Sequence, residues 1–532
     1  MLNSKRLWTT TLLLGLAFDF LFWGKVPGIS FPIFIALILL AGILVLSDSG
    51  IRPNKRALLL ILPIGFFATM TFLRAEPMTT FLNYLLSFVF LAFFVLSYTG
   101  GRWFSFSLSD YVTGMFRLAG STLISPLGFI NETRKNKKES NIKSKSKNFL
   151  PILRGLFIAL PIVAIFASLL SSADVVFAQR LDEFIKLFKL ENLPEYVFRG
   201  ILILVIAYFL LGILLHAARK SRNKKLIGEE KPLLAPFLGF TEASIVLGSV
   251  LFLFIAFVII QFQYFFGGNA NIHIEGYTFA EYARRGFGEL VTVAFFSLLL
   301  LLGLSTITRR PKKSQQKIFS IFGIALVTLV LVMLLSAFYR LKLYETAYGF
   351  SRLRVYSHVF MIWLGILLIA IVLLGILRKE RAFAPAMTLA ILGFAITLNL
   401  LNVDSYIVRQ NIARTEKSNA DLDYAYLADL SDDVVPALTD ILDEKSVTPA
   451  TQNLVAVSLA CHRYQNASRI DANEDSPLPW QSFHLSHSRA SRSYVLLAPK
   501  LNGYTANNDE WYWQITAPDG TEYDCNNQFT WD

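Results

Sequence analysis

Long apolar stretches separated by short polar connectors dominate the chain up to about residue 402. A helix needs about 20 mostly apolar residues to cross the hydrocarbon core of a bilayer. Eleven stretches approach this length, and because a backbone in lipid must satisfy its own hydrogen bonds, each is predicted to be a helix. They are residues 7–23, 28–47, 57–73, 79–99, 151–171, 196–217, 241–265, 287–307, 318–339, 356–377 and 384–402. The first follows Lys5 and Arg6 without a small-residue cleavage site, so we expect it to be retained as a membrane helix.

Basic residues gather at the N-terminus and in every second connector. The clusters are Lys5-Arg6, Arg52 to Arg56, Arg134 to Lys147, Arg219 to Lys231, Arg309 to Lys317 and Arg378 to Arg381. Positively charged loops stay on the cytoplasmic side, so this alternation predicts one topology. The sequence therefore predicts a multi-pass protein of the cell (inner) membrane, with a cytoplasmic N-terminus and an extracytoplasmic C-terminal tail.

The pattern changes after Asp404. Residues 422–442 are acidic with helical apolar spacing, whereas Tyr494 to Leu497 and Glu510 to Ile515, followed by the turn Pro518-Asp519-Gly520, predict strands. The predicted fold is mainly α: a polytopic α-helical membrane protein of about eleven transmembrane helices with a small extracytoplasmic α+β C-terminal domain.

Five segments follow from these patterns. They are residues 1–100 (membrane helices one to four), 101–150 (a cytoplasmic amphipathic segment and basic loop), 151–403 (core membrane helices five to eleven), 404–492 (an extracytoplasmic, mainly helical region) and 493–532 (a short β-rich extension).

Composition supports a bilayer environment. The chain is 54% hydrophobic and only 17% charged, below the proportion of charge usual in soluble domains. The net charge of +12 is divided, because residues 404–532 hold 9 Lys and Arg against 19 Asp and Glu. A basic membrane part and an acidic tail indicate two environments and disfavour nucleic-acid binding. The only cysteines, Cys461 and Cys525, lie in the tail, either as a disulfide or as two partly buried thiols.

Soluble-enzyme motifs are absent from the sequence. It has no Walker motif, nucleophile elbow, Cys-x-x-Cys or His-Glu-x-x-His, and His484 and His487 have no third metal ligand nearby in sequence. We therefore predict no catalytic residues, cofactor or metal, and lean against an enzyme. The predicted span centres are almost free of charge, which disfavours a transporter, although backbone carbonyls could still line a pore.

Polar and aromatic residues collect instead at the predicted outer ends of the spans. The candidate ligand-binding residues are Glu281, Tyr282, Arg284, Arg285, Glu289, Arg340, Tyr344, Glu345, Arg352 and Arg354. Arginine suits bidentate binding of phosphate or carboxylate, so one interpretation is a pocket for an anionic lipid head group or an acidic peptide. The other interpretation is structural, with Arg–Glu pairs fixing helix ends and attaching the tail.

Several of these segments resemble a known family. They are Glu242-Ala-Ser-Ile-Val-Leu-Gly, Gln261 to Gly268, Tyr282 to Glu289, Ser336 to Arg340, Tyr344 to Arg354 and Leu427 to Leu438. Over roughly residues 150–490 the chain resembles the bacterial membrane proteins of domain of unknown function 4173. The resemblance implies a bacterial envelope location and the fold, and it implies no reaction.

Three functions follow from these observations. The first is a non-enzymatic sensor, scaffold or regulator of the bacterial envelope, with the bilayer and an envelope protein as partners. The second is an enzyme or flippase that binds a lipid phosphate through Arg284, Arg285, Arg340 and Arg352. The third is a transporter or channel. The oligomeric state remains open.

Overall fold

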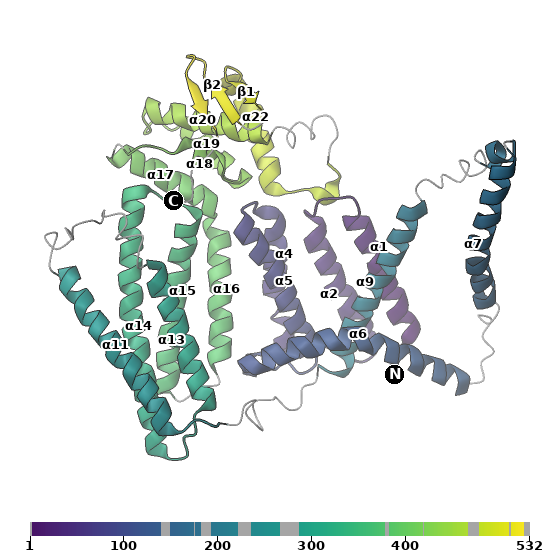
Figure 1. Ribbon diagram of the computed structural model, residues 1–532, viewed down its shortest axis with the longest axis horizontal. Helices are drawn as coiled ribbons and strands as arrows, with labels where there is room; N and C mark the ends of the chain where they lie inside the picture. The colour runs from purple at the N-terminus through teal and green to yellow at the C-terminus, as the bar shows by residue number, and fades with distance from the viewer. Residues whose placement is uncertain are drawn as a thin grey trace. The chain divides into compact units, whose positions relative to one another are not determined.

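A computed structural model describes the backbone of residues 3–139, 149–174, 176–181, 193–221, 236–266, 287–377, 382–418, 420–466, 478–509 and 512–525. Helices dominate this part of the chain (Figure 1). Nine of the described helices are long and apolar enough to cross a membrane. They are Ser30–Asp48, Lys55–Leu73, Pro77–Ser97, Leu193–Arg219, Phe240–Gln261, Gly288–Ile307, Lys313–Tyr348, Arg352–Ile376 and Phe383–Leu401. The prediction of a mainly α, polytopic membrane protein is confirmed.

The two other predicted spans also fold as helices, α1 (Ser4–Phe22) and α7 (Phe149–Ala173), but neither is among these nine. Helix α1 carries three charged residues, Lys5, Arg6 and Asp19, within its 19 residues. The chain divides into two compact units, Met1–Gly24 with Ala36–Pro53 and Phe116–Ser221, and Lys25–Ile35 with Asn54–Met115 and Arg222–Asp532.

The first unit is built around α1, most of α2 (Ser30–Asp48), the later part of α6 (Leu108–Glu139), α7 and α9 (Leu193–Arg219). Helices α1 and α9 lie so close at Gly15 that a Cβ there would sit 2.6 Å from the Ile203 carbonyl oxygen. Arg199 of α9 donates from Nε and Nη2 to the two carboxylate oxygens of Asp19, at 3.0 and 2.5 Å. The pair satisfies the charge of a buried aspartate within a predicted membrane helix.

The membrane part of the second unit begins with α3 (Lys55–Leu58), α4 (Ile61–Leu73) and α5 (Pro77–Ser97). A 3-10 helix, η1 (Trp103–Ser105), follows, and later come α11 (Phe240–Phe266), α13 (Phe287–Ile307), α14 (Lys313–Tyr348), α15 (Arg352–Ile376) and α16 (Phe383–Leu401). Helices α13 to α15 share a core that includes Ala294, Val330 and Leu364. At 36 residues, α14 is about 54 Å long and exceeds the ~30 Å hydrocarbon core.

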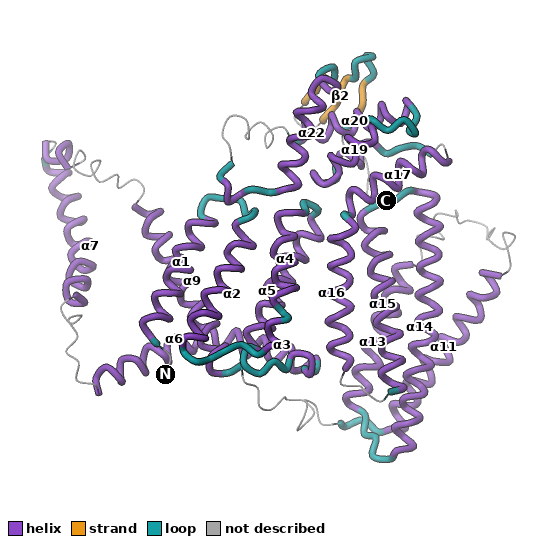
Figure 2. The backbone as a smooth tube through the Cα atoms, turned by 180° about the vertical axis from the view of Figure 1, so that it is seen from behind, coloured by secondary structure: helices purple, strands orange, loops and turns teal. Residues whose placement is uncertain are grey.

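The C-terminal region, residues 403–525, covers the ends of α14, α15 and α16 at which Tyr348, Arg352 and Leu401 lie (Figure 1). We call these the tail-side ends. The region contains α17 (Val403–Ser418), α18 (Tyr424–Ala428), η6 (Asp432–Val434), α19 (Val435–Leu442), α20 (Pro449–Gln465), η7 (Trp480–Ser482) and α22 (Leu485–Leu501). Three strands complete it, β1 (Thr505–Asp509), β2 (Tyr512–Thr516) and β3 (Glu522–Asp524) (Figure 2).

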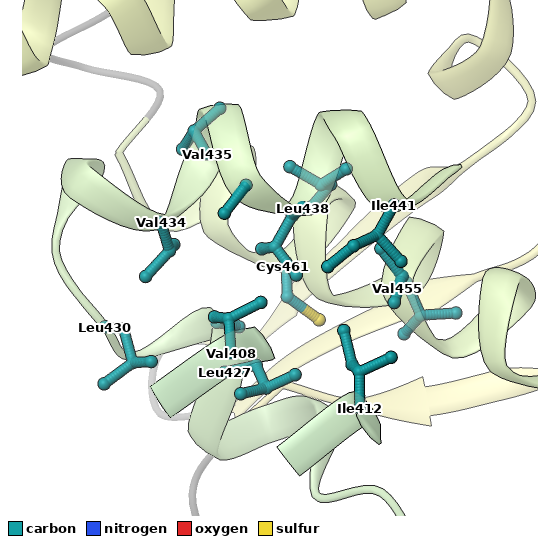
Figure 3. Close-up of a cluster of buried hydrophobic side chains, with 14 of the residues drawn as sticks. Val408, Ile412, Leu427, Leu430, Val434, Val435, Leu438, Ile441, Val455 and Cys461 are labelled. Atoms are coloured by element: carbon teal, nitrogen blue, oxygen red, sulfur yellow. The ribbon is translucent and has the colours of Figure 1, made fainter. Parts of the chain in front are cut away.

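One hydrophobic cluster joins this region to the membrane helices. Val355 of α15 and Leu398 of α16 belong to the same cluster as Val434, Leu438 and many other residues of the C-terminal region. Figure 3 shows Cys461 among these side chains, and Cys461 forms a disulfide with Cys525, with a Cα–Cα distance of 5.5 Å. The disulfide ties α20 to the residue that follows β3.

The strands form one antiparallel sheet in the order β1-β2-β3. The predicted turn at Pro518-Asp519-Gly520 joins β2 to β3, and Gly520 has the positive φ of 83° that favours glycine. The predicted strand Tyr494 to Leu497 is wrong, because these residues lie in α22. Ala490, Tyr494, Leu497 and Leu501 are buried at the three- and four-residue spacing of a helix.

Candidate functional site

The first attachment of the C-terminal region to the membrane helices is an ion pair. Arg352 opens α15, and it donates from Nε and Nη2 to the two carboxylate oxygens of Asp404 in α17, at 2.8 and 2.7 Å. The same carboxylate accepts the backbone N–H of Ser431 at 2.9 Å, and the Asp404 side chain is 0% exposed. The Arg352 backbone N–H donates to the Tyr426 hydroxyl. A buried bidentate pair with these extra hydrogen bonds positions both elements.

The second attachment lies at the α4–α5 turn. Asp433 of η6 accepts the backbone N–H groups of Ala75 and Glu76 at 2.8 and 3.3 Å. Burial raises the pKa of the Asp433 carboxyl above its usual range, while hydrogen bonds and the nearby Arg74 oppose that shift. Arg74 in turn donates to the Asn399 carbonyl of α16 at 2.9 Å.

Glu76 connects this turn to α15. Its carboxylate caps α5 by accepting the backbone N–H groups of Met78 and Thr79, at 2.9 and 2.7 Å, and Pro77 occupies the first helical turn. The Tyr356 hydroxyl of α15 donates to the same carboxylate. A buried glutamate therefore joins α5 to α15 at the turn that Asp433 contacts.

A histidine cluster lies beside these attachments. Asp432 accepts a hydrogen bond from His487 of α22 and lies 3.5 Å from His462 of α20, whose Nδ1 is 2.7 Å from the Tyr494 hydroxyl. His484 lies against His487, with 4.2 Å between the ring centroids. Burial and the charge of His487 lower the pKa of His484 to about 4. No group of three or more potential metal ligands occurs among the described residues.

The turn between α14 and α15 is held from α17. Asn411 accepts the Phe350 N–H at 2.6 Å and donates to the Phe350 carbonyl at 2.9 Å. Arg414 donates to the carbonyls of Thr346 and Ala347, the last turn of α14, at 2.9 and 2.6 Å. Gly349 has a φ of 78°, and a Cβ there would lie 2.7 Å from the Asn411 side-chain oxygen, so the turn requires glycine.

A cavity of about 770 Å³ opens between the first turns of α13 and the tail-side ends of α14 and α15. Its lining comprises Gly288, Glu289, Thr292, Val293, Leu341, Tyr344, Ser351, Leu353, Arg354 and Ser357. The Arg354 guanidinium lies 4.2 Å from the centre of the Tyr344 ring and donates from Nη1 to the Tyr348 and Gly349 carbonyls. The cavity therefore combines one oriented cation with hydroxyl and apolar groups.

The structure places the predicted site residues in different surroundings. Glu281, Tyr282, Arg284 and Arg285 lie outside the described residues. Glu289, Tyr344 and Arg354 line the same cavity, whereas Arg340 lies on α14 and is not part of its lining. Glu345 is buried, and His358 is 2.9 Å from its carboxylate. Arg352 is paired with Asp404.

Sequence reasoning missed Glu76, Asp433 and the Asp432–histidine cluster. Glu76 directly precedes Pro77 at the start of a predicted span, which is the usual position of a capping carboxylate. Asp432 and Asp433 begin η6, and acidic residues directly after a serine are a usual signal of a helix start. Neither signal identifies the distant backbone N–H groups and imidazoles that these carboxylates contact.

Comparison with curated proteins and with solved structures gave no match. A family model described as a domain of unknown function, DUF4153, matches residues 61–441. The sequence resemblance is thus confirmed at the level of an uncharacterised family, and the family model that matches is DUF4153, not 4173. With most of its length matched, this multi-pass membrane protein belongs to the DUF4153 family.

Proposed function

We propose that the chain is a non-enzymatic scaffold or sensor of the bacterial envelope, which holds its C-terminal region in a fixed position on its membrane helices. The observation that carries this proposal is the Asp404 carboxylate. It binds Arg352 of a membrane helix and Ser431 of the C-terminal region at once. Asp433 makes a second contact with another helix pair, at Ala75 and Glu76.

Two attachments at separate helix pairs prevent rotation of the C-terminal region on the membrane helices better than one attachment does. The shared cluster that includes Val355 and Leu398 adds apolar contact between them. A displacement of η6 would therefore act on α4–α5 and on α15 together, which is the property that a sensor or scaffold requires.

The same proposal places the C-terminal region outside the inner membrane and the N-terminus in the cytoplasm. The basic residues Arg309 to Lys313 lie at the ends of α13 and α14 opposite the tail-side ends, as the distribution of positive charge requires. A disulfide at Cys461 and Cys525 also supports an oxidising compartment. Alkaline phosphatase fused after Ser418 should be active, while green fluorescent protein there should be dark. The reverse result would contradict this orientation.

Hydrogen–deuterium exchange of the purified full chain tests the coupling. Asp433→Asn should speed exchange at the α4–α5 turn and also in α19, because one side chain joins them. Arg352→Gln should speed exchange in α17 and η6. Asp440→Asn is the matched control, since Asp440 is 73% exposed and 3.8 Å from Arg409. Changes confined to the mutated element in both variants would contradict a rigid attachment.

A further inference from the structure

We propose that the cavity at Arg354 binds the phosphodiester head group of a membrane lipid. Its volume of about 770 Å³ falls within the usual range for small-molecule sites. The residues that line it belong to the first turns of α13 and α15 and the last turns of α14, all candidate membrane helices. The cavity therefore lies at one end of three candidate membrane helices, which is where we place the lipid head groups.

Arg354 is oriented before any ligand arrives. Its Nη1 donates to the Tyr348 carbonyl at 3.1 Å and to the Gly349 carbonyl, and its plane lies over Tyr344. Both hydrogens of Nη1 are thus used. Within the described residues, Nε and Nη2 have no acceptor and the guanidinium has no carboxylate partner. An arginine at a membrane surface whose Nε and Nη2 donors have no acceptor within the described residues is suited to binding an external anion.

Arg352 shows which group the Nε and Nη2 edge of an arginine can bind in this protein. Two residues before Arg354, it donates from Nε and Nη2 to both oxygens of Asp404, at 2.8 and 2.7 Å. Two oxygens of a phosphate present a similar pair of acceptors to an arginine. Among the described residues no carboxylate pairs with the equivalent edge of Arg354, so phosphate is the ligand group that we assign to it.

The remaining lining selects a lipid. Hydroxyls of Ser351 and Ser357 add polar groups, while Leu341, Val293 and Leu353 provide apolar surface for the glycerol and the first acyl carbons. Glu289 also lines the cavity and already interacts within the chain. Its negative charge disfavours a phosphomonoester, which carries about two charges at neutral pH, and favours a phosphodiester, which carries one.

Native mass spectrometry of the delipidated full-length protein tests this assignment. The probes are phosphatidylglycerol, diacylglycerol with the same acyl chains, and soluble glycerol phosphate. We expect phosphatidylglycerol to bind and diacylglycerol to bind at least about tenfold more weakly, because charge-assisted hydrogen bonds to phosphate are lost. Equal binding of diacylglycerol would overturn the assignment. Equal binding of glycerol phosphate would overturn the lipid as the source of the phosphate.

Arg354→Gln should weaken phosphatidylglycerol binding about tenfold. Arg409→Gln is the matched control, because the exposed Arg409 side chain lies 3.8 Å from Asp440 and is not among the residues that line the cavity. Its lipid affinity should remain within about twofold of wild type. Unchanged binding in Arg354→Gln, or an equal loss in both variants, would overturn the proposal.

A second variant leaves every charge in place. Ser357→Leu adds side-chain volume to the cavity wall and should weaken phosphatidylglycerol binding even if Arg354→Gln fails to fold. Ordinary lipid binding by a folded Ser357→Leu protein would contradict a ligand inside the cavity. Lipid binding and attachment of the C-terminal region are separable, because they use Arg354 and Arg352 respectively.

Discussion

Asn83 in α5 and Asn399 in α16 exchange two side-chain hydrogen bonds, each amide donating to the other's oxygen at 2.9 and 2.8 Å, although 316 residues separate them. Both side chains are fully buried. The Asn399 amide also donates to the Ala395 carbonyl of its own helix. Two membrane helices from distant parts of the chain are therefore joined by a closed pair of amides.

Replacing one amide of this pair should lower the free energy of unfolding more than replacing both. Asn83→Leu leaves Asn399 with an unsatisfied oxygen, so we expect a loss of about 1–2 kcal/mol in the free energy of unfolding. Asn399→Leu should behave similarly, and the double variant should be more stable than the sum of the single losses predicts. Denaturant unfolding in detergent would measure this cycle, and strictly additive losses would contradict the amide pair.

The Arg352–Asp404 pair should be sensitive to removal of either partner. Asp404→Ala leaves a part-buried guanidinium unpaired, so the expected loss is about 3–5 kcal/mol, and Arg352→Ala should be comparable. Asp440→Ala, at an exposed and distant ion pair, should change stability by less than about 1 kcal/mol. Thermal unfolding of the three variants compares them, and equal small effects would contradict a buried pair.

His484 should make the protein sensitive to acid. Its folded pKa of about 4 is below the ordinary value of 6.5, so the unfolded chain binds the proton more readily. Stability is present above pH 6.5 and is lost as the pH falls from 6.5 toward 4, by about 2–3 kcal/mol. His484→Asn should flatten this part of the stability profile.

The raised pKa of Asp433 acts in the opposite direction, since its neutral form is favoured in the folded state and its contribution declines as the pH rises. Both proteins contain Asp433, so subtracting the stability profile of His484→Asn from that of the wild type removes the contribution of Asp433. Identical pH profiles of melting temperature for the two proteins would contradict the role of His484.

Reduction of the disulfide should weaken the C-terminal region. Cys461 and Cys525 are 64 residues apart, and a closed loop of that length corresponds to about 4 kcal/mol in a chain-entropy model. Adding a reductant should lower the unfolding temperature of the wild type and leave Cys461→Ser/Cys525→Ser unchanged. A reductant effect of equal size in the double variant would indicate another cause.

Apolar length and helical period made the membrane helices predictable, because each stretch reports its own secondary structure. The misread segment, Tyr494 to Leu497, shows where local pattern fails. Its β-branched and aromatic residues suit a strand. The segment is nevertheless helical, because Ala490 and Leu501 are buried at helical spacing with Tyr494 and Leu497. This burial requires the hydrophobic core against which the helix packs.

The site was less predictable than the fold. Arg352 and Arg354 are two residues apart with the same side chain, yet one binds Asp404 and the other faces a cavity. Two residues that are two positions apart on a helix point about 200° apart, so their partners depend on which elements lie on each side. Asp404 contacts Arg352, and Ser431 contacts Asp404, only through tertiary packing, which no local pattern encodes.

The α14–α15 turn at Gly349 also has a consequence for biogenesis. Asn411 and Arg414, which hold this turn by hydrogen bonds, are synthesised only after α15 and α16. A nascent or truncated chain without α17 therefore exposes this loop, without its hydrogen bonds to Asn411 and Arg414, to the insertion and proteolysis machinery. Closure of this loop therefore requires α17, so it follows the synthesis of both helices that the loop joins.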